Sequence, residues 1–353
     1  MIALATPPRP PAPPITPAQA DAGPGNQHQR EFQLVTGDGI TLSVYDSGPA
    51  TANHTVVFLH GLCLSRITWA RHVNRLLADH GPSVRVINYD HRGHGASAHA
   101  PMRTYTINQL ADDLAHLLAS LHVQSPLTLV GHSMGGMAAL AYLTRRPSQR
   151  PIDPTGLVLI ATAAGKLSQR GLGRLLSTPA TTALAHAADR TPERLLHGLI
   201  KPVSAALSPV CSRVPAGTIA SVTLTALSTT ALSTAIGYLP SLRTYDLSHT
   251  LAAVRAQTVI VSGGVDLLTP PQHSRELAAA IPGAIHLHIP TAGHMLPQQA
   301  PDVIHRAIEQ ASGLDSIAQI PLDAPISGRR PRHRPRCAAS PPQHCGAHLC
   351  GVG

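Results

Sequence analysis

Aromatic side chains are scarce in this chain of 353 residues, where two Phe, six Tyr and one Trp make up only 3% of the sequence. Proteins that bind single-stranded nucleic acids stack the bases on aromatic side chains, so the shortage argues against that activity. Hydrophobic residues nevertheless amount to 43% of the chain. We therefore expect the core, and any ligand pocket, to be built from aliphatic side chains.

Cysteines are also few, and their number, five, is odd. Five cysteines without regular spacing do not form a disulfide framework, which fits a reducing compartment. The Cys and His residues near the C-terminus match no zinc-binding template, so we predict no metal site and no cofactor. The C-terminal residues concerned are Cys337, His344, Cys345, His348 and Cys350, and the other two cysteines are Cys63 and Cys211.

Lysine is nearly absent, since only Lys166 and Lys201 accompany the arginines, yet the net charge is +9. Five arginines against two aspartates lie within residues 314–353, and the remaining charge is spread along the chain without a basic stripe. A nucleic-acid-binding surface requires clustered positive charge. We therefore interpret the charge as an ordinary solvated surface and predict no nucleic-acid partner.

Long apolar runs are missing as well. No run reaches the 18 or more residues that a membrane-spanning helix requires, and residues 1–14 lack the basic and apolar regions of a secretory signal. We therefore expect no integral membrane segment and a cytoplasmic location. Nothing in the sequence indicates an oligomeric state.

The two ends of the chain have compositions that oppose regular structure. Residues 1–30 are rich in Pro and Ala, and residues 313–353 contain a run of Arg, Pro and His. Segments of this kind bury too little apolar surface to fold, so both are predicted to be disordered. Beside the first segment, Phe32–Val35 and Ile40–Tyr45 flank Thr-Gly-Asp-Gly, a pattern that predicts a β-hairpin.

Short apolar strands alternate with helical patterns through the rest of the chain. This alternation implies an α/β fold with a parallel sheet covered by helices on both faces, formed by residues 31–162 and 258–312. Residues 163–257, rich in Leu, Ala, Ser and Thr, interrupt it and are predicted to form a helical cap over the sheet. Strands are predicted at 55–59, 84–89, 127–130, 157–160, 258–262 and 284–289, and helices at 67–80, 107–121, 137–144, 272–280 and 301–310.

A serine lies where one of these strands turns into a helix. The sequence Gly131-His132-Ser133-Met134-Gly135 follows the strand at 127–130 and precedes an Ala-rich helix. This is the form of a nucleophile elbow, in which a sharp turn exposes the serine and glycines remove side chains that would collide with neighbouring backbone. Ser133 is therefore predicted to be a nucleophile.

A serine hydroxyl is a weak nucleophile and needs a base, which in turn is oriented by a carboxylate. In this fold type the carboxylate and then the histidine follow the serine along the chain. Asp266 follows the strand at 258–262, and His294 follows the strand at 284–289. We predict that these two residues complete a catalytic set with Ser133, although either alone fits an ordinary loop residue.

Acyl transfer also requires hydrogen-bond donors for the oxyanion. The backbone N–H of Met134, directly after the nucleophile, and that of Leu62, in the loop His60-Gly61-Leu62-Cys63 after the strand at 55–59, are the predicted donors. Cys63 has no base placed for it, so we interpret it as a packing residue.

Together these segments resemble the α/β-hydrolase fold family, in its esterase, lipase and haloperoxidase-like branch. The resemblance covers about residues 31–312. The residues that carry it are Gly-His-Ser-Met-Gly-Gly around Ser133, His60-Gly61, Asp-His-Arg-Gly-His-Gly-Ala-Ser at 90–97, Asp266 before Leu-Leu-Thr-Pro, and Gly293-His294.

The resemblance implies a mostly parallel central sheet flanked by helices, with residues 163–257 as the family's variable cap. It also implies that Asp90, Arg92 and His94 form a structural turn beside the site rather than part of the chemistry. We expect an ester hydrolase that acts on a small-molecule ester with an apolar acyl or alcohol group. Perhydrolysis, thioester, lactone or carbon–carbon bond hydrolysis, and a non-catalytic ligand-binding homologue, stay open as alternatives.

Overall fold

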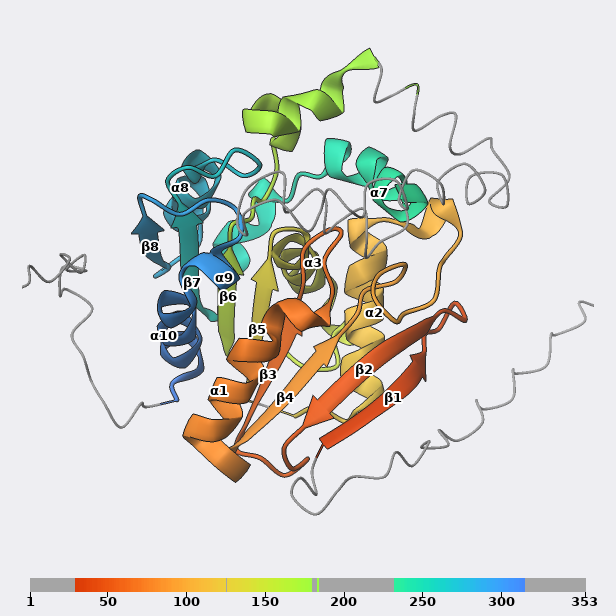
Figure 1. Ribbon diagram of the computed structural model, residues 1–353, viewed down its shortest axis with the longest axis vertical. Coiled ribbons are helices and arrows are strands. Elements are labelled where there is room, and N and C mark those ends of the chain that lie inside the picture. The colour runs from red at the N-terminus through yellow and green to blue at the C-terminus, as the bar shows by residue number, and fades with distance from the viewer. Residues whose placement is uncertain (1–28, 125, 180–182, 184–231, 315–353) are drawn as a thin grey trace, which may run out of the picture. The chain divides into compact units, whose positions relative to one another are not determined.

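The computed structural model describes residues 29–124, 126–179, 183 and 232–314 (Figure 1). Eight strands of this part form one sheet in the order β1-β2-β4-β3-β5-β6-β7-β8. The first two pairs, β1 with β2 and β2 with β4, are antiparallel, and all other neighbours are parallel. The strands are β1 (Gln29–Val35), β2 (Thr41–Ser47), β3 (His54–Leu59), β4 (Val84–Tyr89), β5 (Leu127–His132), β6 (Gly156–Ile160), β7 (Gln257–Gly263) and β8 (Ile285–Ile289).

The inner strands are apolar because both faces of the sheet are covered. Every residue of β3, β4, β5 and β6 is buried, as expected for parallel strands between two helical layers. The predicted α/β fold with a mostly parallel sheet is thus confirmed. The helices are α1 (Ala70–His80), α2 (Ile107–Ser120), α3 (Met134–Leu143), α7 (Leu232–Thr244), α8 (Pro271–Ala280), α9 (Leu296–Gln299) and α10 (Pro301–Ser312).

Alternate residues of each strand supply two separate cores. On one face, Val57 and Leu59 of β3 join the apolar sides of α2, α3 and α8. On the other, Val56 and Phe58 of the same strand join α1 and α10. Side chains of a strand point to opposite faces in turn, so one strand holds both helical layers in place.

Helix α2 begins as predicted. The hydroxyl oxygen of Thr106 accepts a 3.0 Å hydrogen bond from the backbone N–H of Gln109, which satisfies one of the free donors at the helix start. Its buried face includes Leu110, Leu114 and Leu117, spaced as an amphipathic helix requires.

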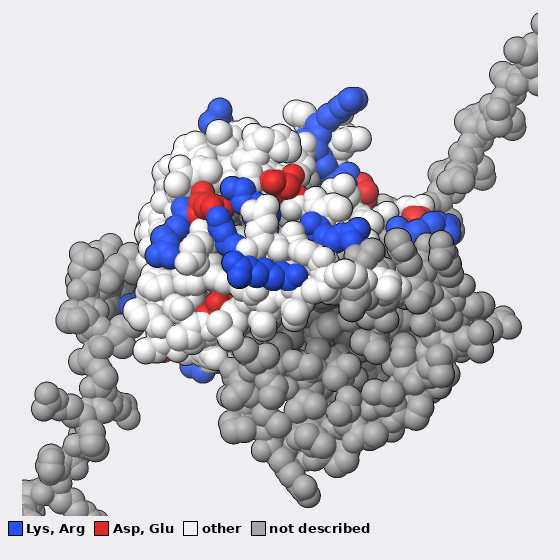
Figure 2. Space-filling model, turned by 90° about the horizontal axis from the view of Figure 1, so that it is seen from above, with Lys and Arg blue, Asp and Glu red and all other residues white. Residues whose placement is uncertain are grey.

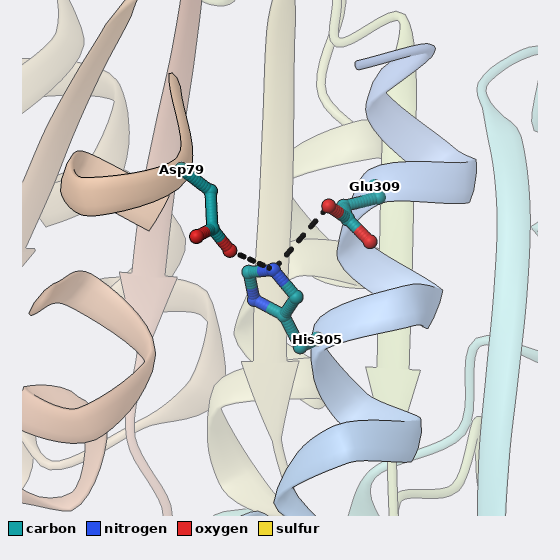
Figure 3. Close-up of side chains that lie close together, drawn as sticks. All are labelled: Asp79, His305 and Glu309. Atoms are coloured by element: carbon teal, nitrogen blue, oxygen red, sulfur yellow. Dashed lines mark ion pairs between the residues drawn. The ribbon is translucent and has the colours of Figure 1, made fainter. Parts of the chain in front are cut away.

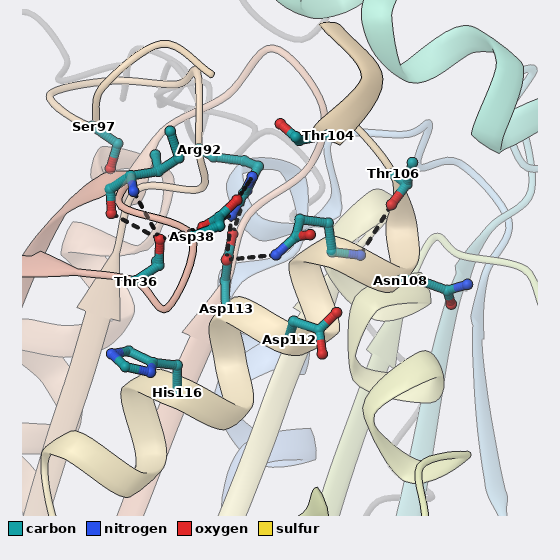
Figure 4. Close-up of polar contacts among 12 residues, drawn as sticks. Thr36, Asp38, Arg92, Ser97, Thr104, Thr106, Asn108, Asp112, Asp113 and His116 are labelled. Atoms are coloured by element: carbon teal, nitrogen blue, oxygen red, sulfur yellow. Dashed lines mark hydrogen bonds and ion pairs between the residues drawn. The ribbon is translucent and has the colours of Figure 1, made fainter. Parts of the chain in front are cut away.

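The turn after β4 is pinned by a buried arginine. The guanidinium of Arg92, which is fully buried, forms paired hydrogen bonds with Asp113 of α2 at 2.6 and 2.7 Å and with Asp38 at 2.9 and 3.0 Å (Figure 4). Two bidentate contacts satisfy the charge of a side chain that has no access to water. Arg92 therefore ties the loop before β2, the turn after β4 and helix α2 together.

Several boundaries differ from the expected ones. Strand β1 begins at Gln29, two residues inside the segment predicted to be disordered, because Gln29 and Arg30 pair with Ser47 and Asp46 of β2. The helix expected from Ile67 begins with a 3-10 turn, Arg66–Trp69.

Most of the predicted cap, and nearly all of the two terminal segments, lie outside the described residues. Within 163–257 the structure shows 3-10 helices at Leu167–Gln169, Gly171–Ser177 and Ser248–Ala253, together with α7. Pro240 lies inside α7. The described elements of this range are helical, and the cap itself stays a prediction.

Charged side chains are dispersed on the face shown in Figure 2. Basic residues of the described part alternate there with acidic ones and with large uncharged areas. This face, like the sequence, lacks a continuous basic stripe among its described residues. Among the described helices, none has both the length and the apolar character needed to span a membrane.

Candidate active site

Ser133 lies between β5 and α3 in a backbone conformation that non-glycine residues rarely adopt. Its φ and ψ are 52° and −118°, which store strain that only the surrounding structure can maintain. The elbow is held by a hydrogen bond from the Ser133 N–H to the carbonyl of Ile160 at 2.9 Å. The Thr162 hydroxyl donates to the Ser133 carbonyl at 2.7 Å.

Two glycines make this turn possible. A Cβ at Gly135 would lie 2.2 Å from the carbonyl oxygen of Leu59, and one at Gly131 would lie 2.5 Å from the Cα of Gly136. Both distances are far below any allowed contact with backbone. The elbow glycines therefore permit the close approach of strand, turn and helix that the sequence predicts.

The structure brings the three predicted catalytic side chains together. The Oγ of Ser133 lies 3.0 Å from Nε2 of His294, and Nδ1 of that ring lies 2.8 Å from Oδ2 of Asp266. Asp266 follows β7 and His294 follows β8, at the carboxyl ends of strands near the elbow. These distances are those of a hydrogen-bonded chain from hydroxyl to carboxylate.

Hydrogen bonds stabilise the charged form of Asp266, although its side chain is buried. Burial alone would raise the pKa of its carboxyl, but the hydrogen bonds from His294 and from the backbone and hydroxyl of Thr269 outweigh it, so the pKa is lowered. The Leu268 and Thr269 N–H groups donate to Oδ1 at 2.8 and 3.0 Å. Oδ2 accepts from His294 and from the Thr269 hydroxyl.

Two residues beside the hydrogen bonds of Ser133, His294 and Asp266 are not predicted from the sequence. The Thr269 hydroxyl lies 2.8 Å from Asp266 Oδ2 and 3.3 Å from His294 Nδ1. Nε2 of His132 donates to the carbonyl oxygen of His294 at 2.9 Å. Their positions, three residues after the acid and one before the nucleophile, were the available signals.

The loop that contains Leu62 is held in place by a buried histidine, His94. The Cys63 N–H donates to Nε2 of His94 at 3.1 Å, and Nδ1 of that ring contacts the Arg92 carbonyl at 3.0 Å. Burial lowers the pKa of His94 to about 3, which keeps the ring neutral and leaves Nε2 free to accept. Cys63 itself has a φ of 60°, so this hydrogen bond holds a strained residue.

The two residues whose N–H groups are the predicted oxyanion donors line the same cavity as the serine. Leu62 and Met134 both line the cavity into which Ser133 and His294 open. Within the part of the chain that the structure describes, neither backbone N–H donates to another protein atom. Both are thus available to a bound oxygen.

Cys63 lines this cavity too, but its chemistry differs. Burial raises the pKa of its thiol to about 12, so the thiolate that would act as a nucleophile does not form near neutral pH. The expectation that Cys63 serves in packing agrees with this shift.

The cavity itself is about 320 Å³ and mostly apolar. Its walls combine the elbow and the loop after β3 with side chains from residues 167–176 and from α7, so described parts of the predicted cap border it. The leucines and methionines on the wall are Leu62, Leu64, Met134, Met137, Leu167, Leu172, Leu176, Leu239, Leu242, Leu268 and Met295.

Comparison with known proteins gives a consistent result. A sequence model of the α/β hydrolase fold matches residues 54–301. RutD of Caulobacter sp. (strain K31), whose name proposes carbamate hydrolase activity, is 27% identical over 294 residues, which cover 78% of this chain and 97% of that protein. The sn-1-specific diacylglycerol lipase ABHD11 of Mus musculus is 27% identical over 248 residues, or 70% of this chain and 76% of the lipase.

A solved structure shares the same architecture. The esterase EaEST from Exiguobacterium antarcticum superposes with a TM-score of 0.58 at 24% identity, over 78% of this chain and 96% of that esterase. At this level of identity the similarity shows a common fold.

Proposed function

Because the chain belongs to the α/β-hydrolase fold family, we propose that it is a serine hydrolase that cleaves carboxylic esters through an acyl-enzyme on Ser133. One observation carries this proposal. A hydrogen-bonded chain runs from Ser133 through His294 to Asp266 and opens into an apolar cavity.

The proposed reaction begins with the neutral imidazole of His294. Its Nδ1–H donates to Asp266, so Nε2 accepts the proton of Ser133 as Oγ attacks the ester carbonyl. Asp266 stabilises the imidazolium, and His294 then delivers the proton to the departing alcohol. Water, deprotonated by the same ring, releases the acid from Ser133 and regenerates the enzyme.

The charge that develops on the carbonyl oxygen is assigned to the N–H groups of Leu62 and Met134. The second of these opens helix α3, where the helix dipole also favours negative charge. Loss of one such donor typically costs about 100- to 1000-fold in turnover. His94 supports this arrangement through its hydrogen bond to Cys63, the residue after Leu62.

The apolar wall supports an ester whose acyl or alcohol group is itself apolar. Leucines from both the core and the described parts of the cap face the nucleophile, and burial of such a group contributes binding energy in proportion to its area. The proposed substrate class is therefore a small, uncharged carboxylic ester.

Hydrolysis of p-nitrophenyl esters of increasing acyl length tests this proposal. We expect Ser133→Ala to lower turnover by about 10⁴-fold or more and to abolish covalent labelling by a fluorophosphonate. The exposed Ser148 provides the control, since Ser148→Ala is expected to keep both. Labelling of the Ser133→Ala protein, or unchanged turnover, would contradict the assignment.

The same assay distinguishes related chemistries. Carbamate, thioester and lactone substrates are offered at equal concentration, and bromination is measured with peroxide, acetate and bromide present. A higher kcat/KM for carbamates than for every ester would replace the proposed substrate class while leaving the role of Ser133 intact.

A further inference from the structure

A second cluster of ionisable side chains lies between α1 and α10, apart from Ser133. Asp79, at the end of α1, and His305 and Glu309, one turn apart on α10, point toward one another (Figure 3). Asp79 stands shortly before β4, at the amino end of that strand, whereas Ser133 follows the carboxyl end of β5. The two clusters are therefore at opposite edges of the sheet.

The distances in this cluster match those between ligands of one metal ion. Nε2 of His305 lies 3.1 Å from Oδ2 of Asp79 and 3.3 Å from Oε1 of Glu309, and the three donor atoms are all within 4.8 Å of one another. In a tetrahedral zinc site with bonds of about 2.1 Å, adjacent ligand atoms are separated by about 3.4 Å.

The histidine at the centre is buried, and Nε2 contacts both carboxylates in poor hydrogen-bond geometry. His305 is only 1% exposed, and among the described residues neither ring nitrogen makes a well-aligned hydrogen bond, although Nε2 lies close to two carboxylates. A buried polar atom without a partner carries a free-energy cost. A cation placed between the ring and the carboxylates would bind Nε2 and lower that cost.

A fourth donor stands beside the three. Nε2 of His80 lies 3.5 Å from the same Oε1 of Glu309, and it too is buried without a hydrogen-bond partner. Glu309 is 8% exposed, so its carboxylate faces two imidazoles away from bulk water. Imidazole and carboxylate together form a donor set that suits divalent first-row metals, zinc in particular.

One neighbouring cation competes with this assignment. Nε of Arg75 lies 3.4 Å from Oδ2 of Asp79, while its Nη1 contacts Asp302 at 2.7 Å. Arg75 is 40% exposed and Asp302 72%, so these contacts are the weaker, solvent-screened kind. Asp79 remains able to turn toward a metal ion.

We propose that Asp79, His305 and Glu309, with His80 as a fourth donor, bind a divalent transition-metal ion such as Zn²⁺. The ion would join the end of α1 to α10 and act on the stability of the fold, at the opposite ends of the strands from the cavity of Ser133. This inference is independent of the proposed hydrolase activity.

Calorimetric titration of the chelator-stripped full chain with ZnCl2 tests the proposal. Because the terminal segment contains cysteines and histidines of its own, the informative quantity is the difference between variants. We expect His305→Gln and Glu309→Gln each to bind one equivalent of Zn²⁺ fewer than the parent. His249→Gln, at an exposed position, is expected to bind as many equivalents as the parent.

Thermal unfolding of the parent provides a readout that needs no variant to fold. We expect Zn²⁺ to raise its Tm and EDTA to reverse the rise, with a smaller rise in Glu309→Gln. Arg75→Ala is expected to bind Zn²⁺ more tightly, because the substitution removes the guanidinium that competes with the metal ion for Asp79. A Tm indifferent to Zn²⁺, or equal stoichiometry in the parent and both α10 variants, would show an ion-pair cluster only.

Discussion

The ring of His132 holds the backbone of His294 in place. Nε2 of His132 donates a 2.9 Å hydrogen bond to the carbonyl oxygen of His294, and the two ring centroids lie 5.0 Å apart. Burial lowers the pKa of His132 to about 3, with a further contribution from nearby His294. The residue before the proposed nucleophile thus positions the proposed base while itself staying neutral.

This relationship predicts a loss of turnover when the donor is removed. We expect His132→Met to lower kcat on a p-nitrophenyl ester about 10- to 100-fold, because small displacements of a reacting group have effects of that size, with KM changed much less. His132→Gln keeps an N–H donor and is expected to recover part of the loss. Equal kcat values for both variants would argue against positioning.

Arg92 is predicted to be a major stabilising residue. Arg92→Met leaves the carboxylate of Asp113, which is 1% exposed, without its partner. Breaking a buried pair in this way typically costs about 3–5 kcal/mol, to be measured as the free energy of unfolding in urea. The matched change at the surface, Arg170→Met, removes a pair with Glu276 and is expected to cost about 1 kcal/mol or less.

The elbow glycine at 135 is predicted to tolerate no side chain. Gly135→Ala places a methyl group 2.2 Å from the Leu59 carbonyl, and overpacking of this kind costs about 1–3 kcal/mol or more. We expect a lower unfolding midpoint and loss of ester turnover. Gly37 has open space around it, so Gly37→Ala should be neutral or slightly stabilising. A fully active, parent-like Gly135→Ala protein would contradict the packing argument.

Stability is predicted to fall on mild acidification. Burial lowers the pKa of His60 to about 4 and of His94 and His132 to about 3, against about 6.5 in the unfolded chain. Above pH 6.5 both states are neutral and nothing changes. Below pH 6.5 these histidines become protonated in the unfolded state, whereas in the folded state they stay neutral until the pH falls to 4 or 3.

Each of these histidines therefore removes up to about 1.4 kcal/mol of stability per pH unit over that interval. Urea unfolding at pH 7, 6 and 5 measures the slope. An unfolding free energy that is constant from pH 7 to 5 would mean that these rings are protonated in the folded state.

The sequence was informative where a local pattern has a mechanical reason. The pattern Gly131, Ser133 and Gly135 predicts the elbow, because only glycine fits the close approach on either side of the serine. The alternation of strands and helices predicts the fold class. Asp266 and His294 are predicted by their place after strands, since each type of residue alone is common in loops.

Contacts between distant segments were not accessible in this way. Thr269 and His132 act through backbone and side-chain atoms whose neighbours depend on the packing of β5, β7 and β8. Asp79 and His305 meet only because α1 and α10 share one face of the sheet. Nothing in either local sequence distinguishes them from surface residues of an amphipathic helix.

The pairing of β6 with β7 has a consequence for the evolution of this protein. The two strands are direct neighbours, with Gly156 opposite Gln257 and Ile160 opposite Val261, although the whole of residues 163–256 lies between them in the chain. Strand register is fixed by these partners and not by the length of the intervening segment. Described residues of that segment line the cavity. We therefore expect that replacing the segment can change the selectivity of the cavity while Ser133, Asp266 and His294 keep their alignment.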